Sequence, residues 1–303
     1  MRQPKRFHLG RDAARPVLFA IASGVGLAFC ATSPVAGDGP PNVAARITPD
    51  NTNVQAQPAA KAQPPAANPA RQHQLVPFLQ MAQTSRDAVA GVRDYQALFT
   101  KQELVGRKVF NGRMLIKLRH EPFGVYLKFV DQNAGREVLY AGPHYQGKMM
   151  AHEAPGTLSS IVGTVSLEPT SARAMAEGRH PITEIGMAKM MESLMRQWEG
   201  EMKFNDPEDP KVYYYPNAKL AGQIECQAAI TRHENPKRQF RFYETRVFFD
   251  KKSNFPIRLE QYGFPDSAHP EGYLVEQYIY TNIKTNVGLT DADFDVHNRN
   301  YRF

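Results

Sequence analysis

The clearest pattern in the chain is a change in the spacing of its apolar residues near position 90. Leu75, Phe78, Leu79, Ala82 and Val89 recur at the steps of one helix face and predict a helix. After them, aromatic and β-branched residues alternate with polar ones in short runs between turn residues, a pattern typical of antiparallel strands. The first such runs predict strands at residues 95–103, 113–119, 125–130, 137–141 and 147–152.

Turn signals and face assignments follow from the same alternation. Gly106 and the dipeptide Asn111-Gly112 predict turns between the first two strands. In the strand at 113–119, the apolar side chains of Met114 and Ile116 fall on one face and the basic side chains on the other. The strands therefore predict a sheet with one apolar face and one solvated face.

A second helix is predicted between two groups of strands. Its apolar residues recur at steps of three and four, and they are Met187, Met190, Met191, Leu194, Met195 and Trp198. Thr183 precedes it as a candidate N-cap. The chain then returns to strands at residues 212–215, 224–232, 240–249, 257–262 and 273–283. Eight to eleven strands with two helices predict the α+β class, as a curled antiparallel sheet around helical elements.

The N-terminus carries a different signal, which predicts export. Basic residues such as Arg11 and Arg15 precede an uncharged apolar run from Pro16 to Cys30 and then small residues, the layout of a signal peptide. The run has 15 residues, whereas a membrane-spanning helix needs roughly 20. An uncleaved N-terminal tether is the alternative. We interpret Cys30 as part of a discarded signal, because Phe29 stands where a lipidation motif needs a small residue.

Composition separates the rest of the chain into two parts. Residues 31–72 are rich in proline and alanine and lack aromatic residues, so we predict a disordered linker there. Residues 73–303 are predicted to form a single folded domain, which we expect to lie in the periplasm or cell envelope. Residues 1–30 carry four of the seven net positive charges, so the charge gives no reason to predict nucleic-acid binding. Cys226 is then the one cysteine of the mature chain, and we predict it as a buried apolar residue.

Motifs for catalysis and for metal binding are missing from the sequence. Three His-Glu dipeptides occur, but none continues into a zinc-binding helix motif. The aspartates near residues 291–295 begin like a calcium loop, yet Val296 stands where the loop needs glycine. There is no nucleophile elbow and no phosphate-binding glycine loop. We therefore predict no catalytic residue, no metal and no cofactor. An enzyme with a dispersed triad stays an alternative, and His152 or His180 would be its candidates.

The order of several short motifs resembles a known superfamily. Tyr95-x-x-x-Phe99-Thr100-Lys101-Gln102, then Gly112-x-Met114-x-Ile116, then Pro122 and the aromatic strand to Phe129 resemble the opening of the LolA-type lipoprotein carriers. The segments Phe249-Asp250-x-x-Ser253-x-x-Pro256-Ile257 and Asn286-x-x-Leu289-x-Asp291-x-x-Phe294 are similar to its last strands. The whole domain resembles an exported bacterial family, domain of unknown function 1571.

This resemblance implies an incomplete β-barrel closed by helices, with an apolar cavity for acyl chains. The function it implies is a non-enzymatic carrier or sensor whose ligand is the acyl chain of a lipid or lipoprotein. The candidate cavity residues are Phe99, Met114, Ile116, Leu127, Phe129, Met187, Met191 and Met195. The alternative is a regulatory module with a solid core and no ligand, which binds a membrane or envelope protein. In that case the same residues would simply fill the core.

Overall fold

Two amphipathic segments form the two α-helices predicted from their spacing. A computed structural model describes residues 73–156, 163–204, 209–220 and 224–303, so the predicted signal peptide and linker lie outside the described residues. Helix α1 spans Val76–Ala90 and helix α2 spans Met187–Met202. Phe78 of α1 and Trp198 of α2 are both buried, and their ring centroids are 6.0 Å apart. The helices therefore pack against each other through their apolar faces.

The predicted cap of the second helix is wrong. Thr183 lies in a short 3₁₀ helix, η4 (Ile182–Glu184), and Gly186 precedes α2 with a φ of 114°. A Cβ atom at Gly186 would lie 2.5 Å from Leu118 Cδ1, so only glycine fits there without displacement. The backbone N–H of Met187 donates instead to the hydroxyl of Tyr95, 3.1 Å away. A tertiary contact thus replaces the side-chain cap.

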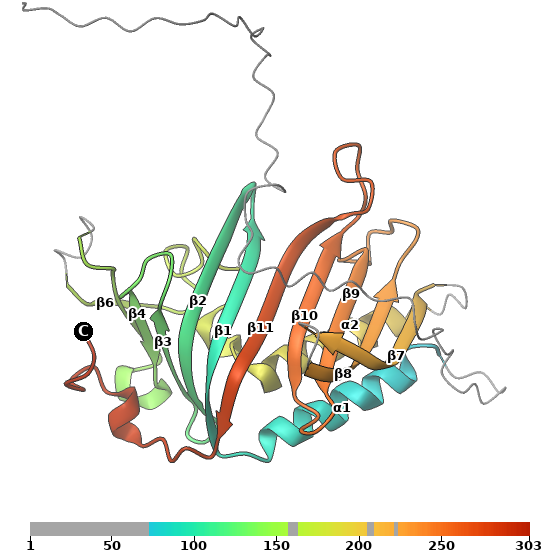
Figure 1. The fold of residues 1–303 in the computed structure, drawn as a ribbon. Coiled ribbons are helices and arrows are strands. Elements are labelled where there is room, and N and C mark those ends of the chain that lie inside the picture. The colour runs from blue at the N-terminus through green and yellow to red at the C-terminus, as the bar shows by residue number, and fades with distance from the viewer. Residues whose placement is uncertain (1–72, 157–162, 205–208, 221–223) are drawn as a thin grey trace, which may run out of the picture. The chain divides into compact units, whose positions relative to one another are not determined.

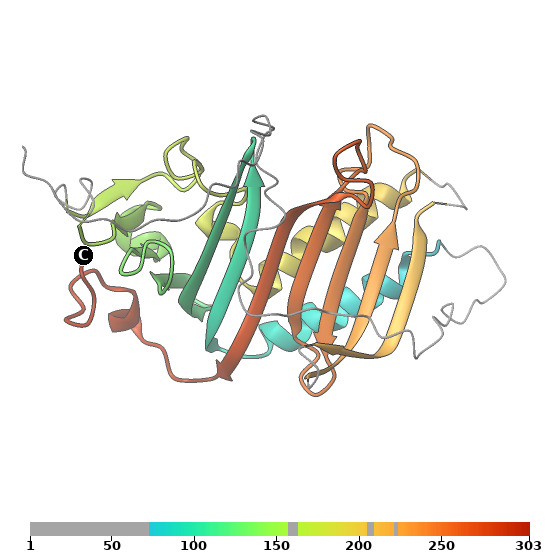
Figure 2. The same cartoon turned by 45° about the horizontal axis from the view of Figure 1, so that its top comes forward.

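The strands of the described residues form one antiparallel sheet of eleven members. In spatial order they are β6-β5-β4-β3-β2-β1-β11-β10-β9-β8-β7, as Figures 1 and 2 show. Their bounds are β1 Asp94–Val105, β2 Lys108–Arg119, β3 Gly124–Phe129, β4 Glu137–Tyr140, β5 Met149–His152, β6 Val165–Leu167, β7 Lys211–Leu220, β8 Ile224–Arg232, β9 Glu244–Asp250, β10 Pro256–Gly263 and β11 Tyr273–Thr285. The edge strands β6 and β7 do not pair with each other, so the sheet stays open. The predicted α+β class with an incomplete barrel is confirmed.

One of the two predicted turns between β1 and β2 is wrong. The hairpin turns at Gly106, whose φ is 62°, and Asn111 and Gly112 lie inside β2. Gly112 pairs with Lys101 of β1. A Cβ atom there would lie 3.2 Å from the ring of Phe129. Glycine is suited to this position because the side chain of Phe129 packs close to the backbone there, and not because the chain turns.

The two faces of the sheet are covered by different segments. Helices α1 and α2 lie together against one face, here called the inner face (Figures 1 and 2). The predicted alternation in β2 is confirmed, because Met114 and Ile116 are buried in the core whereas Lys117 points to the other side. There its Nζ donates to Asp293 Oδ1 at 2.7 Å. Asp293 belongs to the 3₁₀ helix η5 (Asp291–Phe294).

The C-terminal tail thereby covers the outer face of β3 and β4. The rings of Tyr126 and Tyr301 stack with centroids 4.0 Å apart, and Phe294 is buried beside Leu139. Cys226 is buried too, as predicted. Neither helix of the described residues is long and apolar enough to cross a bilayer.

Candidate functional site

A cavity of about 1200 Å³ lies on the inner face of the sheet. Its walls come from β1 to β6, β10, β11, helix α2 and residues 168–186, which connect β6 to α2 and are called the strap from here on. The strands that form it are distant in sequence but adjacent in space, because β1 pairs with both β2 and β11. The chain thus builds one pocket from its first and last strands.

Four of the eight predicted cavity residues line this cavity. They are Phe99, Met114, Leu127 and Phe129. They meet because Met114 pairs with Phe99 on one side and with Phe129 on the other. Residues that are paired across antiparallel strands point to the same face. The strand alternation therefore placed these four side chains correctly on the inner face.

The other four candidates lie outside the cavity lining. Ile116, Met187 and Met191 are buried in the core between helix and sheet, and Met195 packs against the same core. The helix turns a different stripe to the cavity, which includes Met190, Ser193, Leu194, Gln197 and Gly200. Both stripes have helical spacing, so the sequence could not distinguish them. Lipid contact by any of the eight stays a prediction.

The lining changes character along the sheet. From β2 to β6 it is mainly apolar, with further side chains that the sequence did not single out, namely Val138, Met149, Ala151, Val165 and Leu167. Toward β11 and β10 it becomes polar, with Glu276, Tyr278, Tyr280 and Gln261. The cavity therefore has an apolar half and a polar half.

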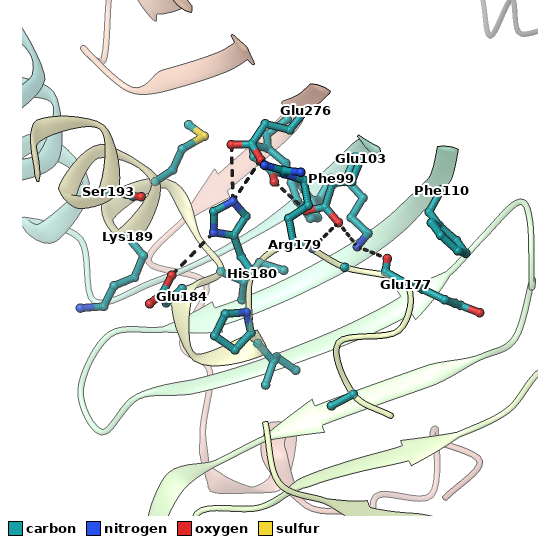
Figure 3. A pocket seen from close by; sticks show the side chains of 18 of the residues that line it. Phe99, Glu103, Phe110, Glu177, Arg179, His180, Glu184, Lys189, Ser193 and Glu276 are labelled. Carbon is teal, nitrogen blue, oxygen red and sulfur yellow. Dashed lines mark hydrogen bonds and ion pairs between the residues drawn. The ribbon is translucent and has the colours of Figure 1, made fainter. Parts of the chain in front are cut away.

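Two buried carboxylates lie at the polar half. Glu103 of β1 and Glu276 of β11 are register partners and each is only 2% exposed. Glu276 Oε2 accepts from Arg179 Nε at 2.6 Å, and His180 Nε2 lies 3.2 Å from the same oxygen. Glu103 accepts from the hydroxyl of Tyr278 at 2.6 Å and from the backbone N–H of Arg179 at 3.1 Å. Figure 3 shows Glu103, Glu276, Arg179 and His180 converging. We call these four residues the clasp.

The clasp has the electrostatics of a tightly paired cluster. Burial raises the pKa of Glu276, but the hydrogen bonds and charges of His180 and Arg179 outweigh burial and bring this pKa below its ordinary 4.5. Burial lowers the pKa of His180, yet Glu276 outweighs that effect, so the pKa of His180 lies above 6.5. The pKa of Tyr278 is raised well above its usual range, first by burial and then by the two carboxylates. The contacts therefore favour the ionised carboxylate of Glu276 and the protonated ring of His180, which attract each other.

Further contacts tie the strap to the sheet. Arg136 pairs with Glu177 of the strap at 2.5 Å and with Glu153 at 2.8 Å. Lys101 Nζ donates to the carbonyl oxygen of Glu177 at 3.2 Å. Arg179 Nη1 also donates to the carbonyl oxygen of Leu104. The strap therefore lies over the sheet as one wall of the cavity and is held there by charged hydrogen bonds.

The sequence reasoning missed the clasp. Glu103 is at the end of the strand predicted from Tyr95, four residues after Phe99, and so on the same face. A glutamate on the apolar face of a strand was the available signal. The sequence indicates His180 only as a candidate member of a dispersed triad. In the described ranges no hydroxyl or thiol hydrogen-bonds to His180, and no three acidic, histidine or cysteine side chains gather as metal ligands would.

Residues 92–303 match the family described as protein of unknown function (DUF1571). The chain belongs to this family. A search of curated proteins found no match for this DUF1571 protein.

Several solved structures are similar to this DUF1571 protein at low sequence identity. The Mycobacterium tuberculosis lipoprotein LppX is 10% identical with a TM-score of 0.41, and the match covers 72% of this chain and 98% of LppX. A LolA superfamily protein from Nitrosomonas europaea is 10% identical with a TM-score of 0.28, covering 71% and 97%. A chain of the Pseudomonas aeruginosa MucA/MucB complex is 10% identical with a TM-score of 0.38, covering 72% and 60%.

Proposed function

We propose that this protein is an exported, non-enzymatic carrier or sensor that binds the acyl chain of a lipid or lipoprotein in the cavity of the inner face. The observation that carries the proposal is the apolar half of that cavity. Phe99, Met114, Leu127 and Phe129 line it, and behind the cavity the same side chains pack into the core of the domain. A core that was solid throughout would leave no cavity of this size above them.

The size and polarity of the cavity support a long apolar ligand. Its volume of about 1200 Å³ exceeds the ~300–1,000 Å³ that is usual for pockets of drug-sized ligands. Each buried methylene group would contribute roughly 0.8 kcal/mol. Burial of a chain of a dozen or more methylenes would therefore be enough for tight binding, and the proposed function requires no catalytic group. The signal-peptide pattern of residues 1–30 supports a place in the periplasm or cell envelope, where such ligands occur.

The test is whether the protein retains an acyl chain. The full chain is expressed in a bacterium that exports it, purified from the envelope fraction, and analysed by native mass spectrometry and organic extraction. We expect a bound acyl-chain species, and uptake of a fluorescent fatty acid by the emptied protein. An empty protein that takes up no fatty acid would refute the proposal and favour the protein-interaction module.

A matched pair of variants locates the binding. Phe129→Glu places a carboxylate in the cavity lining, whereas Val130→Glu changes the next residue, which is 41% exposed and outside the lining. We expect Phe129→Glu to abolish retention and Val130→Glu to leave it unchanged. Undiminished retention in both variants would mean that the ligand binds elsewhere.

A further inference from the structure

The charged side chains that line the cavity are not balanced. Six glutamates line it, and each has a basic side chain at 3.7 Å or closer: Glu103 with Lys101, Glu153 and Glu177 with Arg136, Glu184 with His180, Glu201 with His233, and Glu276 with Arg179. A further cation of the lining, Lys189, pairs with Glu192 at 2.9 Å. Each carboxylate of the cavity lining thus already has a basic side chain of the protein as its partner.

Three guanidinium groups of the lining have no such partner. Arg173 of the strap, Arg196 of α2 and Arg241 before β9 all line the cavity and are solvent-exposed. Within the part of the chain that the structure describes, none of them has an ion pair with a carboxylate. The positive charge of Arg241 acts on His180, where it partly opposes the rise in the pKa that Glu276 causes. An excess of positive charge therefore faces the cavity at its solvent-exposed border.

The positions of two of these arginines indicate which end of an amphiphilic ligand would lie at which end of the cavity. The apolar lining comes from β2 to β6, at one end of the sheet order. Arg196 precedes Gln197, whose Oε1 accepts from Gln261 Nε2 of β10 at 2.7 Å. Arg241 lies just before β9, so both arginines belong to the opposite half. The lining also includes Gly200 and the half-exposed Phe204, and the ring of Phe204 lies 6.4 Å from that of Phe240, the residue before Arg241. A ligand with its chain over β2 to β6 would have its head near these guanidiniums.

We infer that the cavity selects anionic amphiphiles. The acyl chain lies in the apolar half, and Arg196 and Arg241 bind a carboxylate or phosphate head. Arg173 adds to the positive electrostatic potential at the border of the cavity. This inference rests on the proposed function. Guanidinium groups bind carboxylate and phosphate oxygens with two parallel hydrogen bonds, which is the geometry such heads offer. A neutral head on the same chain would not form these charge-assisted hydrogen bonds.

The experiment compares three probes with the same twelve-carbon chain. Binding of dodecanoate, dodecyl phosphate and dodecanol to the delipidated full chain is measured by displacement of a fluorescent fatty acid at low ionic strength. We expect at least one anion to bind roughly tenfold more tightly than dodecanol, because charge-assisted hydrogen bonds add about 1.4 kcal/mol or more. The tighter of the two anions identifies the head as a carboxylate or a phosphate. The advantage should shrink as salt screens the charges.

Variants connect this preference to the two arginines. Arg196→Gln/Arg241→Gln should bring the affinity for the anions down to that for dodecanol and leave dodecanol binding unchanged. Arg238→Gln is the matched control, since Arg238 is exposed and only three residues from Arg241 but outside the lining. It should change nothing. Circular dichroism confirms that each variant is folded.

The outcomes separate this inference from the proposed function. If all three probes bind with equal affinity, and the double variant behaves like Arg238→Gln, the charge selectivity is refuted while acyl-chain binding stands. If none of the probes binds, the proposed function fails and the inference with it.

Discussion

Replacing Glu276 by glutamine tests whether the clasp holds the strap against the sheet. The change keeps the size of the side chain and removes its charge, so that Arg179 and His180 lose the carboxylate that they share. Glu276 is 2% exposed, so little water can replace the lost interaction. The variant should therefore lose both thermal stability and the ordered position of the strap.

The expected loss follows from the contacts. Removing one partner of a buried ion pair costs about 3–5 kcal/mol, and a net hydrogen bond to a charged group contributes about 1.5–3 kcal/mol. Glutamine keeps one oxygen as an acceptor for Arg179, which places the expected loss near the lower end, at about 3 kcal/mol. For a domain of this size, each kcal/mol corresponds to roughly 2–4 °C. The melting temperature should fall by roughly 6–12 °C.

The loss should depend on pH in a specific way. The pKa of Glu276 is lowered from 4.5 in the folded protein, so its contribution is present above 4.5 and disappears as the pH falls through the lowered value. The pKa of His180 is raised from 6.5, so its contribution is present below 6.5 and disappears as the pH rises through the raised value. The difference between wild type and Glu276→Gln should be largest between pH 4.5 and 6.5.

The assay is urea and thermal unfolding of both proteins across pH 4–9, with circular dichroism as the readout. Glu184→Gln is the control. Glu184 also faces His180, at 3.7 Å, but its side chain is 45% exposed, so its loss should cost less than about 0.5 kcal/mol. Equal destabilisation by the two variants, or a difference that does not change with pH, would refute the clasp as the anchor of the strap.

Three further predictions concern the packing of the molecule. Trp198→Ala removes a fully buried indole from the helix–sheet core. It should lower the free energy of unfolding, measured with urea, by about 3–5 kcal/mol. A smaller loss would mean that neighbouring side chains move in to fill the space. Gly186→Ala should lower the free energy of unfolding by about 2 kcal/mol or more, because the φ of Gly186 is 114° and the new methyl would clash with Leu118. Gly200→Ala in α2 has open space around the new methyl and should raise the free energy of unfolding by about 0.5–1 kcal/mol. Burial raises the pKa of the Cys226 thiol to about 11, so labelling by a thiol reagent at pH 8 should be slow until urea unfolds the chain; fast labelling of the native protein would contradict this burial.

Most of the secondary structure could be predicted from the sequence because it depends on local periodicity. Apolar residues at helical steps indicated α1 and α2, and alternation indicated the strands and their inner faces, so that Phe99, Met114, Leu127 and Phe129 were placed together correctly. Local turn chemistry was less reliable. Asn111-Gly112 reads as a turn, yet Gly112 lies in β2 where Phe129 approaches its backbone.

The cavity and its clasp depend on contacts between residues far apart in the chain. Glu103 and Glu276 are separated by more than half of the folded region, and they become neighbours only when β1 pairs with β11. The helical spacing of Met187 and Met191 is equally compatible with a core and with a cavity, because periodicity defines a face but not what that face contacts. Packing of α2 against α1 and β10 turned this face inward and left Met190 and Gln197 facing the cavity. Local patterns therefore defined the elements, while long-range pairing and packing defined the site.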